Sequence, residues 1–216
     1  MSLLNKLMQE DINKTPGSPK RGRKPLSQDD LERGRYKIVE AAKILFVEQG
    51  YQSVSMRGLA RSINLSPTSL YRFYPNKRAI LIHIWGELFD GLFRDCRSAA
   101  ARGGEPQSAL IAYTNCFVDY WVANPKNYMM VYGEIDQPKK GESFFADSEM
   151  VATELAYLGE LLAKCGIAND KIELTLQQLI CIMQGVCHSL VTIPELNWKD
   201  AHALTGGLVE NLLGSK

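Results

Sequence analysis

The stretch Ser62–Lys77, SINLSPTSLYRFYPNK, combines the residue types that suit binding to a polyanion. It holds hydroxyls, aromatic rings and two cations, and it contains no carboxylate. An Arg guanidinium can read a guanine edge through two hydrogen bonds, a Thr methyl can meet a thymine methyl, and a Tyr hydroxyl can reach a phosphate. Residues 49–86 contain no Asp or Glu, and either would repel phosphate there. The chemistry indicated is recognition of a nucleic acid.

Charge is divided unevenly along the chain of 216 residues, whose net charge is only +1. Residues 1–80 contain 15 Lys and Arg against 7 Asp and Glu, a net charge of +8. Residues 81–216 contain 10 against 17, a net charge of −7. This asymmetry favours a polyanionic partner for the N-terminal part, and the alternative is an ordinary basic face in solvent.

The spacing of apolar residues predicts that helices position this basic stretch. Residues 31–49 carry apolar side chains at helical intervals, and Gly50 suits the end of that helix. Either Ser53 or Ser55 can cap a second helix, which continues to Ile63. The two helices would form the support on which the basic stretch rests.

A third, short helix is expected over about Pro67–Phe73. Asn64 tolerates a left-handed turn before it, and Ser66 can cap it. Pro67 suits the first helical position, and Pro75 stops the helix. A helix, a short turn and a short capped helix make the helix-turn-helix arrangement, whose second helix can enter the major groove of DNA.

Leu70 and Phe73 are three residues apart and are expected to pack inward together, which leaves Thr68, Tyr71 and Arg72 facing outward. For Tyr74, and less so for Tyr71, the alternative is ordinary core packing. The residues of this domain that we expect to contact DNA are Ser55, Arg57, Ser66, Thr68, Ser69, Tyr71, Arg72, Tyr74 and Lys77.

Residues 38–81, IVEAAKILFVEQGYQSVSMRGLARSINLSPTSLYRFYPNKRAIL, resemble the DNA-binding domain of the TetR family of transcriptional regulators. The resemblance rests on the Ala41-Ala42 pair with Phe46, on Gly50-Tyr51, on Leu59-Ala60, on Ser66 with Leu70-Tyr71, and on the aromatic-Pro-x-Lys motif of residues 74–77. It implies an all-helical homodimer with a second domain that binds a small molecule. It also implies phosphate contacts from Tyr71 and Lys77.

A basic segment, SPKRGRKPLS at residues 18–27, precedes these helices. Gly22 and Pro25 interrupt it, so a helix is not expected. Arg21, Gly22 and Arg23 resemble the core of an AT-hook, and basic arms of this kind enter narrow minor grooves. We therefore expect Arg21, Arg23 and Lys24 to contact DNA. The alternative is a disordered tail that only aids solubility.

The remainder of the chain is predicted to be a helical domain that is rich in aromatic residues. Its first helix follows Asn76, and further helices are expected near 107–122, 125–132, 146–164, 169–192 and 198–213. Many rings with a few polar tips favour a small-molecule cavity, and the alternative is that they only fill a core. The predicted ligand-binding residues are Phe89, Phe93, Tyr113, Phe117, Tyr120, Trp121, Tyr128, Met129 and Tyr132.

The segment Leu179–Ile193 is apolar almost all round, so more than one of its sides should be covered. One side can face its own core and the other a second subunit, and the alternative is a helix buried inside a monomer. The predicted dimer-interface residues are Cys181, Gly185, His188, Leu204 and Leu208.

Catalytic and metal chemistry find little support in the sequence. The three histidines lack the spacing of metal ligands, and neither a phosphate-binding glycine loop nor a nucleophile elbow is present. Five scattered cysteines indicate a reducing compartment rather than a disulfide framework. The N-terminus does not resemble a signal peptide, and no run approaches the ~20 apolar residues of a membrane span. We therefore expect a cytoplasmic protein that is not an enzyme and has no cofactor, metal or membrane partner.

These inferences together predict an all-α protein with three parts. Residues 1–30 would form a flexible basic arm, residues 31–78 a three-helix DNA-binding domain, and residues 79–216 an effector-binding and dimerisation domain. The expected function is a ligand-responsive repressor that binds a pseudo-palindromic operator as a homodimer and is released by a small apolar or aromatic effector. The alternatives are a transcriptional activator and an architectural DNA-binding protein without an inducer.

Overall fold

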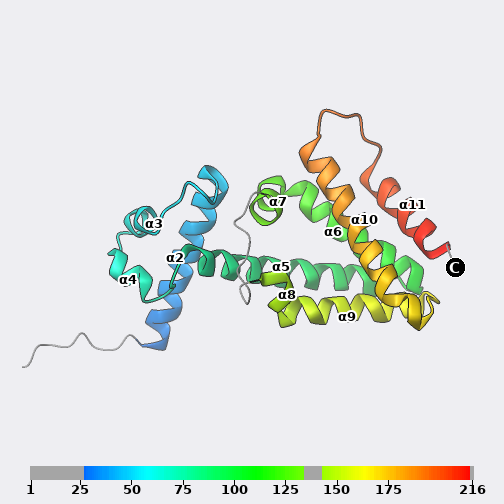
Figure 1. Ribbon diagram of the computed structural model, residues 1–216, viewed down its shortest axis with the longest axis horizontal. Helices are drawn as coiled ribbons and strands as arrows, with labels where there is room; N and C mark the ends of the chain where they lie inside the picture. Colours follow the sequence, from blue (N-terminus) through cyan, green and yellow to red (C-terminus); the bar gives the residue numbers. More distant parts are fainter. Residues whose placement is uncertain (1–26, 134–142, 215–216) are drawn as a thin grey trace, which may run out of the picture.

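The computed structural model describes residues 27–133 and 143–214, and these residues form helices with short connections and no strand (Figure 1). The all-α prediction is confirmed. The elements, in chain order, are α2 (Gln28–Gln49), α3 (Met56–Ser62), α4 (Pro67–Tyr71), α5 (Lys77–Arg102), α6 (Pro106–Ala123), α7 (Pro125–Tyr132), α8 (Phe144–Asp147), α9 (Glu149–Lys164), the 3-10 turn η1 (Asn169–Lys171), α10 (Ile172–Thr192) and α11 (Ala201–Gly214). The predicted minor-groove residues Arg21, Arg23 and Lys24 lie outside the described residues.

The first described helix begins earlier than the sequence indicated. The hydroxyl oxygen of Ser27 accepts a hydrogen bond from the backbone N–H of Asp30 at 3.1 Å, so Ser27 is the N-cap of α2. The helix therefore includes residues 28–30, which we had assigned to the arm. Asp29 and Asp30 lie in its first turn, where carboxylates suit the positive end of the helix dipole.

Capping side chains define the two short helices that follow. Ser55, and not Ser53, caps α3, by accepting from the N–H of Gly58 at 3.0 Å. Asn64 takes up the expected left-handed conformation, with φ of 55°. Ser66 caps α4 through the N–H of Ser69, with Pro67 at the first helical position, as predicted.

Close packing holds the short helix α4 and the turn after it in place. Leu70 is completely buried and belongs to the hydrophobic core. A Cβ atom added to Gly34 of α2 would lie 2.5 Å from two atoms of the Phe73 ring. The ring of Phe73 therefore reaches its position only because residue 34 has no side chain, and this contact fixes the end of α4 against α2.

Helix α5 connects the two parts of the molecule. Asn76 caps it by accepting from the N–H of Ala79 at 2.7 Å, and it continues for 26 residues. In Figure 1 the small helices α2 to α4 lie at one end of α5, and α6 to α11 are arranged along the rest of it. Helix α6 packs lengthwise on α5, and α9, α10 and α11 complete the larger bundle.

Two predicted helix boundaries in this bundle are wrong for local reasons. The expected helix 146–164 is divided because Ser148 caps α9 through the N–H of Val151 and separates it from α8. The last helix begins at Ala201 rather than at Trp198, whose indole N–H donates to the carbonyl of Ile193 at 2.8 Å. A loop between α10 and α11 results.

Candidate DNA interface and effector cavity

Helix α4 presents a polar face to solvent over its buried Leu70. Thr68, Arg72 and the half-exposed Tyr71 lie on this face. Because Leu70 is anchored and Phe73 is packed against α2, the outward side chains are carried by a rigid short helix. A face of this kind can enter a major groove and offer a methyl, a phenol and a guanidinium to base edges and phosphates.

The serines near α4 form hydrogen bonds within their own domain. The hydroxyls of Ser55 and Ser66 accept the N-cap hydrogen bonds of α3 and α4, and both residues are exposed. Ser69 is half-buried, and its Oγ lies 2.8 Å from Oγ of Ser66. Arg57 is exposed on α3. These four residues surround the outward face of α4 or belong to it, and their contact with DNA stays a prediction.

Tyr74 corrects the predicted DNA interface. Its side chain is only 5% exposed, and its ring packs edge-on against the imidazole of His83 with centroids 5.7 Å apart. Burial raises the pKa of the Tyr74 hydroxyl, which has no hydrogen-bond partner among the described residues. Tyr74 is therefore a core residue in this structure, and the expectation that it contacts DNA is wrong.

Lys77 binds a loop of its own domain. Its Nζ donates to the carbonyl of Tyr51 at 2.6 Å and to that of Gln52 at 3.3 Å. The same ammonium lies 4.1 Å from the centre of the Tyr51 ring. Lys77 thus holds the loop between α2 and α3 against the start of α5, and a phosphate contact would be additional to this role.

The larger bundle contains an apolar pocket of about 510 Å³, which lies among α5, α6, α9 and α10. Five of the nine predicted ligand-binding residues line it, and these are Phe89, Phe93, Tyr113, Phe117 and Tyr132. Its volume and its apolar lining with a few polar tips are typical of a small-molecule site.

The other four predicted residues do not line this cavity. Trp121 is 0% exposed and packs behind the wall, with its ring 5.9 Å from that of Phe89 and 5.4 Å from that of Tyr132. Tyr128 packs against Trp121 on the far side. Tyr120 lies toward α2, and Met129 is 51% exposed at a different pocket. For these four, the expected ligand contact is wrong for the cavity that the structure contains.

The sequence analysis missed the opposite wall of the cavity. The residues that form it are Phe145, Val151, Glu154, Leu155, Leu158, Ile180, Met183 and Gln184. A signal for one of them was present, because Val151, Leu155 and Leu158 mark the apolar stripe of α9 and Glu154 falls on that stripe. A buried carboxylate needs a hydrogen-bonding or ionic partner, so a glutamate at this position indicates a polar group within an otherwise apolar region.

Glu154 forms a polar corner of this apolar cavity. Its side chain is 2% exposed. Oε1 accepts a hydrogen bond from the Tyr113 hydroxyl at 2.8 Å, and Oε2 accepts a short one from Nη2 of Arg97. Burial raises the pKa of Tyr113, so that this phenol keeps its proton and donates it. The hydrogen bond to Glu154 raises the pKa of Arg97.

Comparison with known proteins identifies the first part of the chain. Residues 38–84 match the family model described as bacterial regulatory proteins, tetR family. The chain is 32% identical over 95 residues to the HTH-type transcriptional regulator UidR of Escherichia coli strain K12. Residues 38–84 form a TetR-family DNA-binding domain. The prediction from the motifs of residues 38–81 is confirmed, and this part of the chain is similar to transcriptional regulators.

Similarity to TetR-family structures extends over most of the chain, at low identity. FadR of Bacillus halodurans superposes with a TM-score of 0.67 at 20% identity, over 84% of this chain and 95% of that one. Thermus thermophilus FadR, a repressor solved in complex with lauroyl-CoA, gives 0.61 at 20% identity, over 83% and 93%. These likenesses show a shared fold. The match with UidR covers 44% of this chain and only 42% of UidR, so it concerns less than half of that relative.

Helix α10 has an uncovered apolar side. Cys181, Gly185 and His188 are exposed on it, and together with Leu204 and the exposed Leu208 of α11 they make up the predicted interface. Contrary to expectation, the segment Asn169–Thr192 is long and apolar enough, by length and composition alone, to cross a membrane, and 28% of its qualifying 18-residue window is buried. Its packing on α6, α9 and α11 is that of a bundle helix.

Proposed function

We propose that this TetR-family chain is a ligand-responsive transcriptional repressor that acts in the cytoplasm. It binds a pseudo-palindromic operator as a homodimer and is released by a small apolar or aromatic effector. One observation carries the proposal. Five residues separate the end of α4 from the start of the unbroken helix α5, and further along α5 carries Phe89 and Phe93 into the cavity wall. A ligand in that cavity therefore touches the rigid element that holds the recognition helix.

This arrangement gives the two parts of the chain different roles. Residues 31–78, together with the first turn of α2, serve as the DNA-binding domain, and residues 79–216 bind the effector and a second subunit. Residues 1–26 add a basic arm that reaches the minor groove beside the half-site through Arg21 and Arg23. Two recognition helices about one helical turn apart require an operator with matching two-fold symmetry.

A second copy of the chain is the partner that the exposed side of α10 fits. A groove of about 340 Å³ runs along it, bordered by Cys181, Gly185, Leu204 and Leu208. No atom lies within 4 Å of a Cβ added to Gly185, so this surface is open in the single chain. Covering it with the same surface of a second copy removes apolar area from water on both subunits at once.

The cavity suits an effector with an apolar body. Its lining of aromatic rings and aliphatic side chains favours a molecule with a large apolar surface. Since Thermus thermophilus FadR is a repressor that binds lauroyl-CoA, an acyl chain is the first effector to test on this chain. Glu154 and Tyr113 would then orient whatever polar group the ligand carries.

Release of DNA requires that the effector bind the DNA-free form more tightly than the DNA-bound form. A release of ~100-fold corresponds to about 2.7 kcal/mol of coupling between the two sites. Linkage then demands that operator DNA weaken effector binding by the same factor.

The test begins with selection of binding sites from random duplex DNA by the full-length protein. We expect a two-fold symmetric site. Small apolar and aromatic compounds, together with lauroyl-CoA, are then screened for release of that duplex. Selection of an asymmetric site bound by one chain would contradict the proposal. It would also be contradicted if no compound released the duplex and the protein activated a reporter gene.

A further inference from the structure

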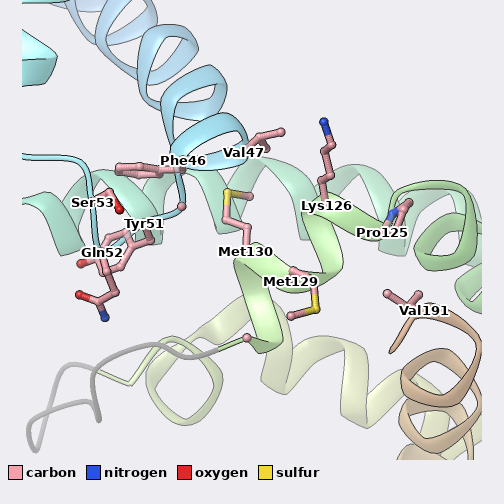
Figure 2. A pocket seen from close by; sticks show the side chains of 12 residues that line it. Phe46, Val47, Tyr51, Gln52, Ser53, Pro125, Lys126, Met129, Met130 and Val191 are labelled. Atoms are coloured by element: carbon pink, nitrogen blue, oxygen red, sulfur yellow. The ribbon is translucent and has the colours of Figure 1, made fainter. Parts of the chain in front are cut away.

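A second pocket, of about 400 Å³, lies where the DNA-binding helices meet the larger bundle. Figure 2 shows the rings of Phe46 and Tyr51 on one side of it and the side chains of Met129 and Met130 on the other. Neither the helix-turn-helix nor the effector cavity includes this junction pocket. Its two walls belong to different domains, so a ligand here would touch both.

The wall that belongs to the DNA-binding domain is rigid. The rings of Phe46 and Tyr51 meet edge-to-face at 5.2 Å. The Lys77 ammonium lies 4.1 Å from the centre of the Tyr51 ring and also holds the Tyr51 carbonyl at 2.6 Å. Tyr51 is therefore fixed by contacts to its ring and to its backbone, and it offers a preorganised aromatic surface.

The wall that belongs to α7 is adaptable. Met130 is buried, whereas Met129 is 51% exposed although its side chain is large and apolar. Methionine side chains adjust to the shape of a ligand and make favourable sulfur contacts with aromatic rings. A rigid aromatic wall opposite two thioethers suits a planar aromatic body.

The charge of the pocket lining favours one class of aromatic compound. Among the described residues that line the junction pocket, Lys126 alone is charged. It is exposed and projects from α7 at the edge of the pocket (Figure 2). Its flexible stem allows the ammonium to reach a group that protrudes from the pocket, where it attracts an anion and repels a cation.

We propose that the junction pocket binds a small aromatic carboxylate, with the ring between Tyr51 and the two methionines and the carboxylate at Lys126. The ligand would tie α7 to the loop that Lys77 anchors to the start of α5, just after the recognition helix. Occupancy would therefore change the affinity for DNA. This last step rests on the proposed function, but ligand binding itself does not.

Calorimetric titration of the full-length protein with 2-naphthoate tests the binding step. Lys126→Gln should weaken binding about threefold to fivefold, the effect of an exposed ion pair, and should leave binding of the neutral analogue naphthalene-2-methanol unchanged. Met129→Glu, at an exposed position that tolerates a polar residue, should abolish naphthoate binding. Lys164→Gln, at an exposed lysine at the end of α9, is the matched control and should behave as wild type. Equal naphthoate affinity in Lys126→Gln and Lys164→Gln, or undiminished binding by Met129→Glu, would overturn the proposal.

A variant of the main cavity separates the two pockets. Ile180→Trp fills the effector cavity and should leave naphthoate binding unchanged, whereas loss of naphthoate binding in this variant would place the ligand in the main cavity and refute the junction site. Saturating naphthoate should also change operator affinity, in both wild type and Ile180→Trp. If naphthoate binds as described but operator affinity stays constant, the junction site stands and its coupling to DNA is refuted.

Discussion

The polar corner of the effector cavity provides a quantitative prediction about stability. Glu154→Leu removes the acceptor of the Tyr113 hydroxyl and leaves that buried group without a partner. This costs about 1–3 kcal/mol of the free energy of unfolding. Arg97 also loses its partner, but its side chain is 40% exposed and can turn to water, so its loss adds little.

Tyr113→Phe removes the other member of the pair. It deletes a hydrogen bond to a charged group, which is worth about 1.5–3 kcal/mol. The double variant Tyr113→Phe with Glu154→Leu replaces both polar partners by apolar groups, and such replacements are nearly neutral. We therefore expect the double variant to be more stable than the sum of the single changes predicts, by about 1–3 kcal/mol of coupling energy.

Urea unfolding, followed by circular dichroism at one fixed protein concentration, measures this cycle. The concentration must be fixed because association of subunits contributes to apparent stability. The pair Lys164→Gln and Asp95→Asn, at separate and exposed positions, provides the additive control. If the costs of Tyr113→Phe and Glu154→Leu simply add, the two side chains do not act as a pair, and Glu154 is not the polar corner described above.

Four further predictions concern DNA binding and assembly. Arg72→Ala should reduce the difference in binding free energy between selected and random DNA by about 1–3 kcal/mol, measured at one fixed salt concentration. Unchanged selectivity would show that α4 is not the recognition helix. Gly34→Val forces the Phe73 ring away and should cost about 1–3 kcal/mol in thermal unfolding, whereas Gly86→Val, with no atom near its Cβ, should cost less. Gly185→Leu should yield monomers in sedimentation equilibrium, and a dimer of normal affinity would exclude α10 from the interface. Deletion of residues 1–26 should weaken binding most at sites flanked by A·T pairs, and equal affinity at low salt would remove the role of the arm.

Local signals in the sequence were sufficient for the DNA-binding half of the fold. Ser66, Pro67 and Asn76 act at helix starts because capping depends on side chains within three residues of the end. Asn64 adopts a left-handed turn for an equally local reason. Tyr74 was wrongly assigned to the DNA interface, because its ring packs against His83 of α5 and the neighbouring residues do not indicate this contact.

The effector cavity was predicted only in part because its walls come from helices that are distant in sequence. Helix α6 is apolar on several sides, so periodicity does not distinguish the side that faces the cavity from the side that faces Trp121. The packing of α9 and α10 against α6 decides this, and no local pattern reports it. On the wall that was not predicted, only Glu154, a carboxylate within an apolar stripe, carried a signal in the sequence.

The central claim is that a ligand in the cavity beside α5 controls DNA binding, and one comparison tests it directly. Operator affinity is measured with and without a saturating effector for wild type, for Ile180→Trp, which fills the cavity, and for Leu174→Trp, which adds the same ring at an exposed position of α10. We expect the effector to weaken operator binding ~100-fold in wild type and Leu174→Trp. We expect the operator affinity of Ile180→Trp to be the same with and without the effector. Release of Ile180→Trp by the effector to the same extent as wild type would contradict the account.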